Sequence, residues 1–277
     1  MLEWGLPAWR RPLRALLALA WLGCGANLDF KQARHLEDAG DKMRAVAAFE
    51  RFLERRPADP RVPEASFRLG RLHAEVLGRC PEAVRYFEAA ARAEGPWAEP
   101  SRLGLMTCPD FFPLQPRSRW TYVDTESGGK NMRLEIAVKA SSGAAGAEVS
   151  GAFFAGAKRF MDYRRRYSRS EWSVWESEGD APDRAPILRF PFRAGRSWEI
   201  RRGKQKVRYD IAADGLTVRT KAGSFPDCLK VKAHTEGYAS WVYEYFCPGV
   251  GRVKTTVGVP GSENPNTELA AFSVSPG

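Results

Sequence analysis

The sequence predicts an α+β protein with two domains, in which helical hairpins precede an antiparallel β domain built as a sandwich, an open barrel or a curved sheet. Residues 28–108 are rich in Ala, Leu, Glu and Arg, and their apolar residues recur at helical spacing. After Pro109 the pattern changes to short alternating segments separated by glycine-rich turns. The predicted divisions are a removable leader at 1–23, the helical domain at 24–108 and the β domain at 109–277.

The leader has the pattern of a secretory signal peptide. An apolar run of nine residues extends from Ala15 to Gly23. Three arginines precede it, at positions 10, 11 and 14. A membrane-spanning helix needs about 20 apolar residues. A basic region followed by a short apolar stretch and small residues therefore predicts an export signal rather than a span.

The stretch "AWLGC" at residues 20–24 resembles the bacterial lipobox, with Trp21 where that family usually has Leu. The resemblance implies that Cys24 is acylated and becomes the new N-terminus, held to the membrane by several acyl chains. Gly25 stands where Asp would indicate retention at the inner membrane, so the expected location is the periplasmic face of the outer membrane in a bacterial cell envelope. The alternative is an ordinary signal peptide with a buried Cys24.

The helical region contains one pattern twice, with Phe49 and Phe87 at equivalent places 38 residues apart. Its stretch "RRPADPRVPEASFRLGRLHAE" resembles the tetratricopeptide repeats of Tol-Pal and barrel-assembly envelope proteins, whose period is about 34 residues. The matching positions are Ala33, Leu36, Ala45, Phe49, Phe52 and Pro57 in the first copy, and Leu69, Gly70, His73, Ala83, Phe87 and Ala90 in the second.

Small residues such as Gly70 are expected to let two helices approach closely while Phe87 fills the space beside them. Repeats of this class usually present a concave face that binds a partner's peptide or helix. The resemblance therefore implies protein binding. The alternative is a packing module that spaces the β domain from the membrane.

Four cysteines remain beside Cys24, an even number that suits disulfides in an exported protein. We expect one helix from Cys80 to about Ala93 and an antiparallel neighbour from Trp97 to Thr107, which would bring Cys80 and Cys108 to the same end. This arrangement predicts a Cys80–Cys108 disulfide. Two free buried thiols are the alternative.

The second half contains strands with one buried face. In "KNMRLEIAVKA" Met132, Leu134, Ile136 and Val138 alternate with polar residues. The segment "DCLKVKAH" does the same, with its apolar residues at 229, 231 and 233. Ten to twelve short strands of this kind are expected.

Two segments of the β half are similar to each other. "FPLQPRSRWTY" at 112–122 aligns without a gap to "FPFRAGRSWEI" at 190–200, so that Trp120 coincides with Trp198. We expect both tryptophans to begin a strand and to pack in the core of a duplicated half. An aromatic ligand shelf is the alternative.

The segment "KAGSFPDCLKV" and the later "WVYEYFCPGVGRVK" resemble a β domain of uncharacterised bacterial lipoproteins, over about residues 111–260. That family often has Ala-Pro-Gly-Val-Gly where this chain has Cys247 followed by Pro-Gly-Val-Gly. The resemblance, with this replacement, implies a Cys228–Cys247 bridge between neighbouring strands. It carries no catalytic residue over to this chain.

No known catalytic or metal-binding motif stands out. The three histidines are His35, His73 and His234, of which the first two occupy positions that repeats use for packing. H-E-x-x-H, G-x-S-x-G and Walker patterns do not occur. We therefore expect a protein that is not an enzyme and that needs neither cofactor nor metal.

Positive charge exceeds negative charge, giving a net charge of +10. Within the basic run at 189–208, Lys204, Lys206 and Arg208 are expected on one strand face, where they would bind phosphate or carboxylate groups of an anionic lipid or wall polymer. A solvated surface is the alternative. Export from the cytoplasm argues against nucleic acid as a partner.

The function that we expect is a membrane-anchored envelope lipoprotein that acts as a non-catalytic scaffold or adaptor, binding envelope proteins through its repeats. The alternative function is a periplasmic carrier that holds a lipid or other apolar ligand in the β domain.

Overall fold

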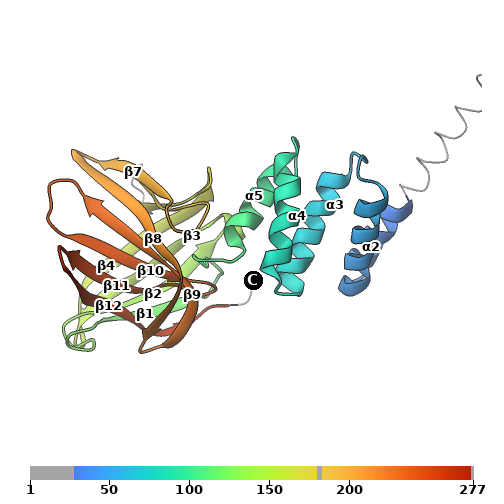
Figure 1. Ribbon diagram of the computed structural model, residues 1–277. Helices are drawn as coiled ribbons and strands as arrows, with labels where there is room; N and C mark the ends of the chain where they lie inside the picture. Colours follow the sequence, from blue (N-terminus) through green and yellow to red (C-terminus); the bar gives the residue numbers. More distant parts are fainter. Residues whose placement is uncertain (1–27, 180–182, 276–277) are drawn as a thin grey trace, which may run out of the picture. The chain divides into compact units, whose positions relative to one another are not determined.

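The computed structural model describes residues 28–179 and 183–275, and the chain divides into two compact units between Ser101 and Arg102 (Figure 1). The predicted signal peptide and Cys24 lie outside the described residues. None of the helices within those ranges is both long and apolar enough to cross a membrane.

The first unit consists of helices arranged as hairpins (Figure 1). A helix covers residues 28–38 and is followed by a turn with Gly40, whose φ of 81° few residues other than glycine adopt. The side chain of Asp41 then accepts a hydrogen bond from the backbone N–H of Arg44 and caps the next helix. The elements that follow are α2 (Lys42–Arg55), α3 (Val62–Arg71), the π-helical turn η1 (Leu72–Val76), α4 (Cys80–Arg92) and α5 (Ala98–Thr107).

Packing in the first unit follows the predicted repeat. A Cβ added at Gly70 of α3 would lie 2.8 Å from ring atoms of Phe87 in α4, so only a glycine permits this approach. Phe49 and Phe52 of α2 are fully buried, and Phe30 packs against both of their rings. The prediction of closely packed helical hairpins is confirmed.

In the described part of the second unit, twelve strands form an antiparallel sheet that is barrel-shaped and nearly closed (Figure 1). The prediction of a β domain is confirmed, and its form is the barrel-like one of the three expected. The strands are β1 (Arg119–Asp124), β2 (Arg133–Ser141), β3 (Gly146–Ala155), β4 (Lys158–Ser170), β5 (Ser173–Glu178), β6 (Arg184–Arg189), β7 (Ser197–Arg202), β8 (Gln205–Thr220), β9 (Gly223–Thr235), β10 (Trp241–Cys247), β11 (Gly251–Val259) and β12 (Ser262–Ser273).

The sheet consists of two consecutive meanders. Its order is β6-β5-β4-β3-β2-β1-β12-β11-β10-β9-β8-β7, so β1–β6 form one half, β7–β12 form the other, and β1 pairs with β12. The two edge strands approach each other where the indole of Trp198 in β7 donates a hydrogen bond to the carbonyl of Pro186 in β6, at 2.9 Å. This contact spans the gap between β6 and β7, the two edges of the sheet, which would have to pair to complete the barrel.

The repeated tryptophan segment coincides with this division. Trp120 lies in β1 and Trp198 in β7, the first strand of each meander, and both side chains are buried. The indole of Trp120 donates to the carbonyl of Val250 at 2.7 Å. The core position that we expected for both residues is therefore confirmed.

Alternating burial of the strands is also as predicted. In β2, Leu134 and Val138 are buried and Ile136 lines an internal cavity. In β9, Leu229 and Val231 are buried. A period of two puts every second side chain on the inner face of the sheet.

The division between the units falls within α5 rather than at residues 108/109. Met106 is part of the hydrophobic core that the β strands share, together with Phe111 and Leu114 of the segment before β1. The last turn of α5 therefore belongs to the β unit, and this tertiary packing could not be seen from the helical pattern.

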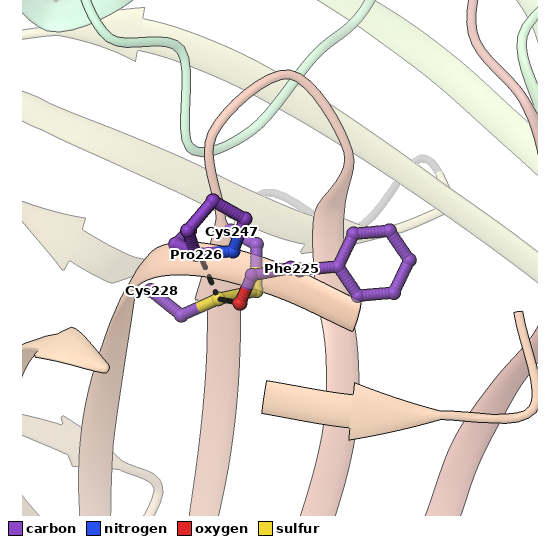
Figure 2. The surroundings of a disulfide bond; sticks show 4 residues. All are labelled: Phe225, Pro226, Cys228 and Cys247. Carbon is purple, nitrogen blue, oxygen red and sulfur yellow. Dashed lines mark hydrogen bonds between the residues drawn. A yellow bond between two sulfur atoms is a disulfide. The ribbon is translucent and has the colours of Figure 1, made fainter. Parts of the chain in front are cut away.

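A disulfide joins Cys228 of β9 to Cys247 of β10, as the lipoprotein resemblance implied (Figure 2). The register of these strands places the two residues directly opposite each other, with their Cα atoms 4.2 Å apart. The sulfur of Cys228 lies 3.2 Å from the carbonyl oxygen of Phe225, a close contact without a proton because a disulfide sulfur carries none.

Cys80 and Cys108 are also disulfide-bonded. Cys80 is the first residue of α4, and Cys108 directly follows the last residue of α5. Their pairing with each other stays a prediction.

Candidate functional site

One candidate site is a charged face on the first helix of each hairpin, here called the first-helix face. Arg68 of α3 donates to Glu37 of the 28–38 helix and to Glu64 of its own helix, both at 2.8 Å. Burial alone would lower the pKa of Arg68, but these two hydrogen bonds outweigh it and the pKa is raised. The face consists of Arg34, Glu37, Glu64, Arg68 and Arg71.

Aromatic rings border this face. Trp97 and Phe67 lie with their ring centroids 5.3 Å apart, and the guanidinium of Arg68 stands 5.8 Å from the Trp97 ring. Both aromatic side chains are partly exposed. Aromatic residues and arginine are enriched at protein–protein interfaces.

His73 lies away from that face, in the turn η1, and its side chain is buried. Its ring stacks on Tyr86 at 5.3 Å, and burial lowers its pKa. This is the packing position expected from the repeat. His35 is exposed, so the same expectation is wrong for that residue, which sits on the outer side of its helix.

The other candidate site is a cavity of about 180 Å³ inside the β unit. Apolar and aromatic side chains form much of its wall, and charged side chains from opposite halves of the sheet reach it. The charged residues that line it are Glu176, Arg202, Glu244 and Arg252, here called the lumen cluster.

Tyrosines connect the wall of the cavity to Glu176 of β5. The hydroxyl of Tyr167 donates to Oε1 of Glu176 at 2.9 Å, and the hydroxyls of Tyr163 and Tyr167 lie 2.6 Å apart. Since a carboxylate only accepts, Tyr167 gives its proton to Glu176 and Tyr163 gives its own to Tyr167. Burial raises the pKa of both phenols, so both keep their protons at neutral pH.

Arg252 of β11 and Glu244 of β10 form the strongest ion pair of the lumen cluster. Nη1 of Arg252 donates to Oε1 of Glu244 at 2.7 Å. Burial alone would lower the pKa of Arg252, but the charge of Glu244 reverses the effect and the pKa lies well above its usual value. The Arg252 backbone carbonyl also accepts a hydrogen bond from the hydroxyl of Tyr122 at 2.9 Å.

Arg202 of β7 is held much more loosely. Its Nη2 lies 3.8 Å from Oε2 of Glu176, too far for a hydrogen bond, and half of its side chain is exposed. Arg165 of β4 approaches the same carboxylate at 3.8 Å and donates to Glu178 at 3.0 Å. Glu176 also lines two further hollows, of about 560 and 320 Å³, so the internal cavity and these hollows meet at this carboxylate.

The predicted anion-binding residues lie outside the barrel. Lys204 is in the turn between β7 and β8, so the expectation that it shares a strand face is wrong, because the chain reverses at Gly203. Lys206 pairs with Glu199 at 2.8 Å and Arg208 pairs with Asp210 at 3.2 Å. Anion binding by these residues stays a prediction.

The lumen cluster was missed at the level of sequence. A usable signal was present in "DYRRRYSR", where Tyr163, Arg165 and Tyr167 share one parity of a strand and therefore one face. The net charge of this run does not say which of its arginines faces inward. Glu176, which accepts from Tyr167, and the pair of Glu244 with Arg252 come from other strands, whose place in the sheet the sequence does not reveal.

Within the described ranges, no group of three or more His, Cys, Asp or Glu side chains lies close enough together to hold a metal ion.

Two units thus define the chain, a helical repeat unit and a nearly closed β barrel with a polar lumen. Residues 30–96 match the tetratricopeptide repeat family, which confirms the resemblance of the helical unit to these repeats. A comparison with curated proteins found no match.

Two solved structures are similar to the chain. One is a protein from Bacteroides fragilis, assigned as exported and as having a YmcC-like fold; it is 18% identical, with a TM-score of 0.43, and the match covers 59% of this chain and 98% of that one. The other, from Parabacteroides distasonis, is assigned as a lipoprotein; it is 13% identical, with a TM-score of 0.40 and the same coverage.

Proposed function

We propose that this chain is a membrane-anchored envelope lipoprotein that works without catalysis as an adaptor, binding a protein partner through its tetratricopeptide repeats. The observation that carries the proposal is the family match over residues 30–96, since repeats of this class commonly bind peptides or helices. The proposed contact surface is the first-helix face.

The side chains of the first-helix face suit a partner segment that carries both positively and negatively charged residues. Arg68 is neutralised by Glu37 and Glu64, whereas Arg71 and Glu75 form an exposed pair at 3.3 Å that a partner can open at little cost. Phe67 and Trp97 offer apolar area beside it. We therefore expect an amphipathic helix or an extended peptide with charged and apolar residues.

Position-specific crosslinking tests this surface. A photoreactive residue at position 71 of α3 should give a defined crosslinked protein in intact envelopes. Position 92 of α4 is the matched control, because Arg92 is also an exposed arginine paired with a glutamate four residues away. Equal products from both positions, or none from position 71, would contradict the proposal.

The proposed location is the periplasmic face of the outer membrane, with the acyl chains of Cys24 as the anchor. It is supported by the basic leader, its short apolar run and the lipobox-like residues 20–24. Cys24→Ser should release the protein from membranes into the soluble envelope fraction.

One observation favours a second function for the β unit. Its sheet leaves a partly open cavity of about 180 Å³ instead of being packed solid with side chains. Sites of about 300–1,000 Å³ are usual for drug-sized ligands, so a carrier function here would concern a small molecule.

A further inference from the structure

We propose that the cavity of the β unit binds a small monoanion with an apolar body, an aryl carboxylate of about the size of benzoate, whose carboxylate pairs with the guanidinium of Arg202. The inference rests on the second function above and adds the chemical class of the ligand. It contrasts with a lipid, which the cavity is too small to enclose.

Unused hydrogen-bond donors indicate an anion. A guanidinium carries five N–H donors in a planar fork that matches a carboxylate. The guanidinium of Arg202 makes no hydrogen bond to any of the described residues, and its ion pair with Glu176 spans 3.8 Å. Its side chain is half exposed and lines the cavity, so a ligand can reach it.

The carboxylates of the lumen cluster are, in contrast, already occupied. Glu244 accepts from Arg252 at 2.7 Å, and Glu176 accepts from Tyr167 at 2.9 Å. The guanidinium of Arg202 is the charged group of the cluster that makes no hydrogen bond to the described residues, since its nearest carboxylate oxygen, Oε2 of Glu176, is 3.8 Å away. This favours a ligand with a negative charge.

The neighbouring phenols do not oppose an anion. Burial raises the pKa of the four tyrosines in the wall, so their rings are neutral at physiological pH; they are Tyr122, Tyr163, Tyr167 and Tyr209. Their faces add apolar area without a second negative charge.

The rest of the wall sets the size and shape of the apolar body. An apolar cavity of about 150 Å³ is large enough for benzene, and this one has about 180 Å³. Aromatic rings at its wall include Phe112 and Phe246, whose centroids lie 6.1 Å apart. The remaining apolar lining residues include Leu114, Trp120, Ile136, Val149 and Ile187.

Ligand-observed fluorine NMR tests the inference on the full-length protein in lipid nanodiscs, with empty nanodiscs as the reference. The probe is 4-fluorobenzoate, and 4-fluorobenzamide is its neutral counterpart of the same shape. The charge-removing variant is Arg202→Gln. The matched control is Arg208→Gln, which removes an arginine that pairs with Asp210 on the outer side of β8.

We expect 4-fluorobenzoate to bind, 4-fluorobenzamide to bind at least about tenfold more weakly, and Arg202→Gln to weaken the benzoate about tenfold or more, as for a lost charge-assisted hydrogen bond. Arg208→Gln should leave the affinity unchanged. Equal binding of both probes, unaffected by Arg202→Gln, would keep a carrier function but overturn the anionic class. A loss confined to Arg208→Gln would overturn the lumen site, and no binding of either probe would overturn the carrier function as well.

Discussion

Glu244 and Arg252 face each other within the β unit, with Oε1 of the carboxylate 2.7 Å from Nη1 of the guanidinium. The register of β10 and β11 shifts between Tyr245 and Phe246, next to this pair. Such a bulge re-aims the side chains beside it. The pair links two strands and places charged groups at the wall of the cavity.

Glu244→Gln should reduce the free energy of unfolding by about 1–3 kcal/mol, because Arg252 loses the charged acceptor of its hydrogen bond. Glu135→Gln is the control, since Glu135 pairs with Arg133 at an exposed site where such pairs contribute little. Urea unfolding of the three proteins measures the effect. Equal losses for the two variants would show that the ion pair of Glu244 and Arg252 stabilises the fold no more than an exposed pair does.

Gly70→Ala should destabilise the helical unit by about 1–3 kcal/mol, the usual cost of overpacking. The added methyl would lie 2.8 Å from ring atoms of Phe87. The double variant Gly70→Ala with Phe87→Leu should lose less unfolding free energy than the two single variants lose together, because the smaller leucine side chain leaves room for the methyl group. Strict additivity in thermal unfolding would refute this close contact.

Asp124 predicts a specific sensitivity to acid. Its carboxylate accepts hydrogen bonds from the hydroxyl and backbone N–H of Ser127, as well as from backbone N–H groups of Gly129 and Met132, and these bonds lower its pKa from 3.8 to about 2. Because the folded pKa is the lower one, its stabilisation is present above pH 4 and is lost as the pH falls towards 2.

Asp124→Asn should therefore be less stable than the native chain at pH 7, and the difference should shrink between pH 4 and pH 2. Chemical unfolding across this range measures it. A stability difference that stays constant with pH would argue against an ionised Asp124 holding the turn between β1 and β2.

Removing the bridge between β9 and β10 should destabilise the β unit. Cys228 and Cys247 are separated by 19 residues, and closing a loop of this size contributes about 3 kcal/mol in the chain-entropy view. The Cys228→Ala, Cys247→Ala double variant should lose about that much in non-reducing urea unfolding. A loss below about 1 kcal/mol would mean that the cross-strand packing alone holds these strands.

Much of the fold could be predicted from local pattern. Helical spacing located α4 from Cys80, and alternation identified the inner faces of β2 and β9, because burial on one face leaves a period in the sequence. The equivalence of Trp120 and Trp198 indicated a duplicated half, and each residue lies in the first strand of a meander.

The order of strands and the lumen could not be predicted in the same way. That β1 pairs with β12, and that β6 comes close to β7, depends on contacts between residues far apart in sequence. The lumen cluster depends on the same closure, since Glu176 and Arg202 meet only when the two edges approach. The prediction of an anion site rested on basic residues that are close in sequence, namely Lys204, Lys206 and Arg208. Closeness in sequence says little about where a ligand can enter.

The anchor at Cys24 is the central feature, because an adaptor of the envelope has to be exported, processed and held at a membrane. The direct measurement is the mass of the N-terminal peptide of the native protein, isolated from the membrane fraction. We predict a peptide that begins at Cys24 and carries acyl groups on both its sulfur and its amino group. A peptide that begins at Met1, or an unmodified Cys24, would contradict the account.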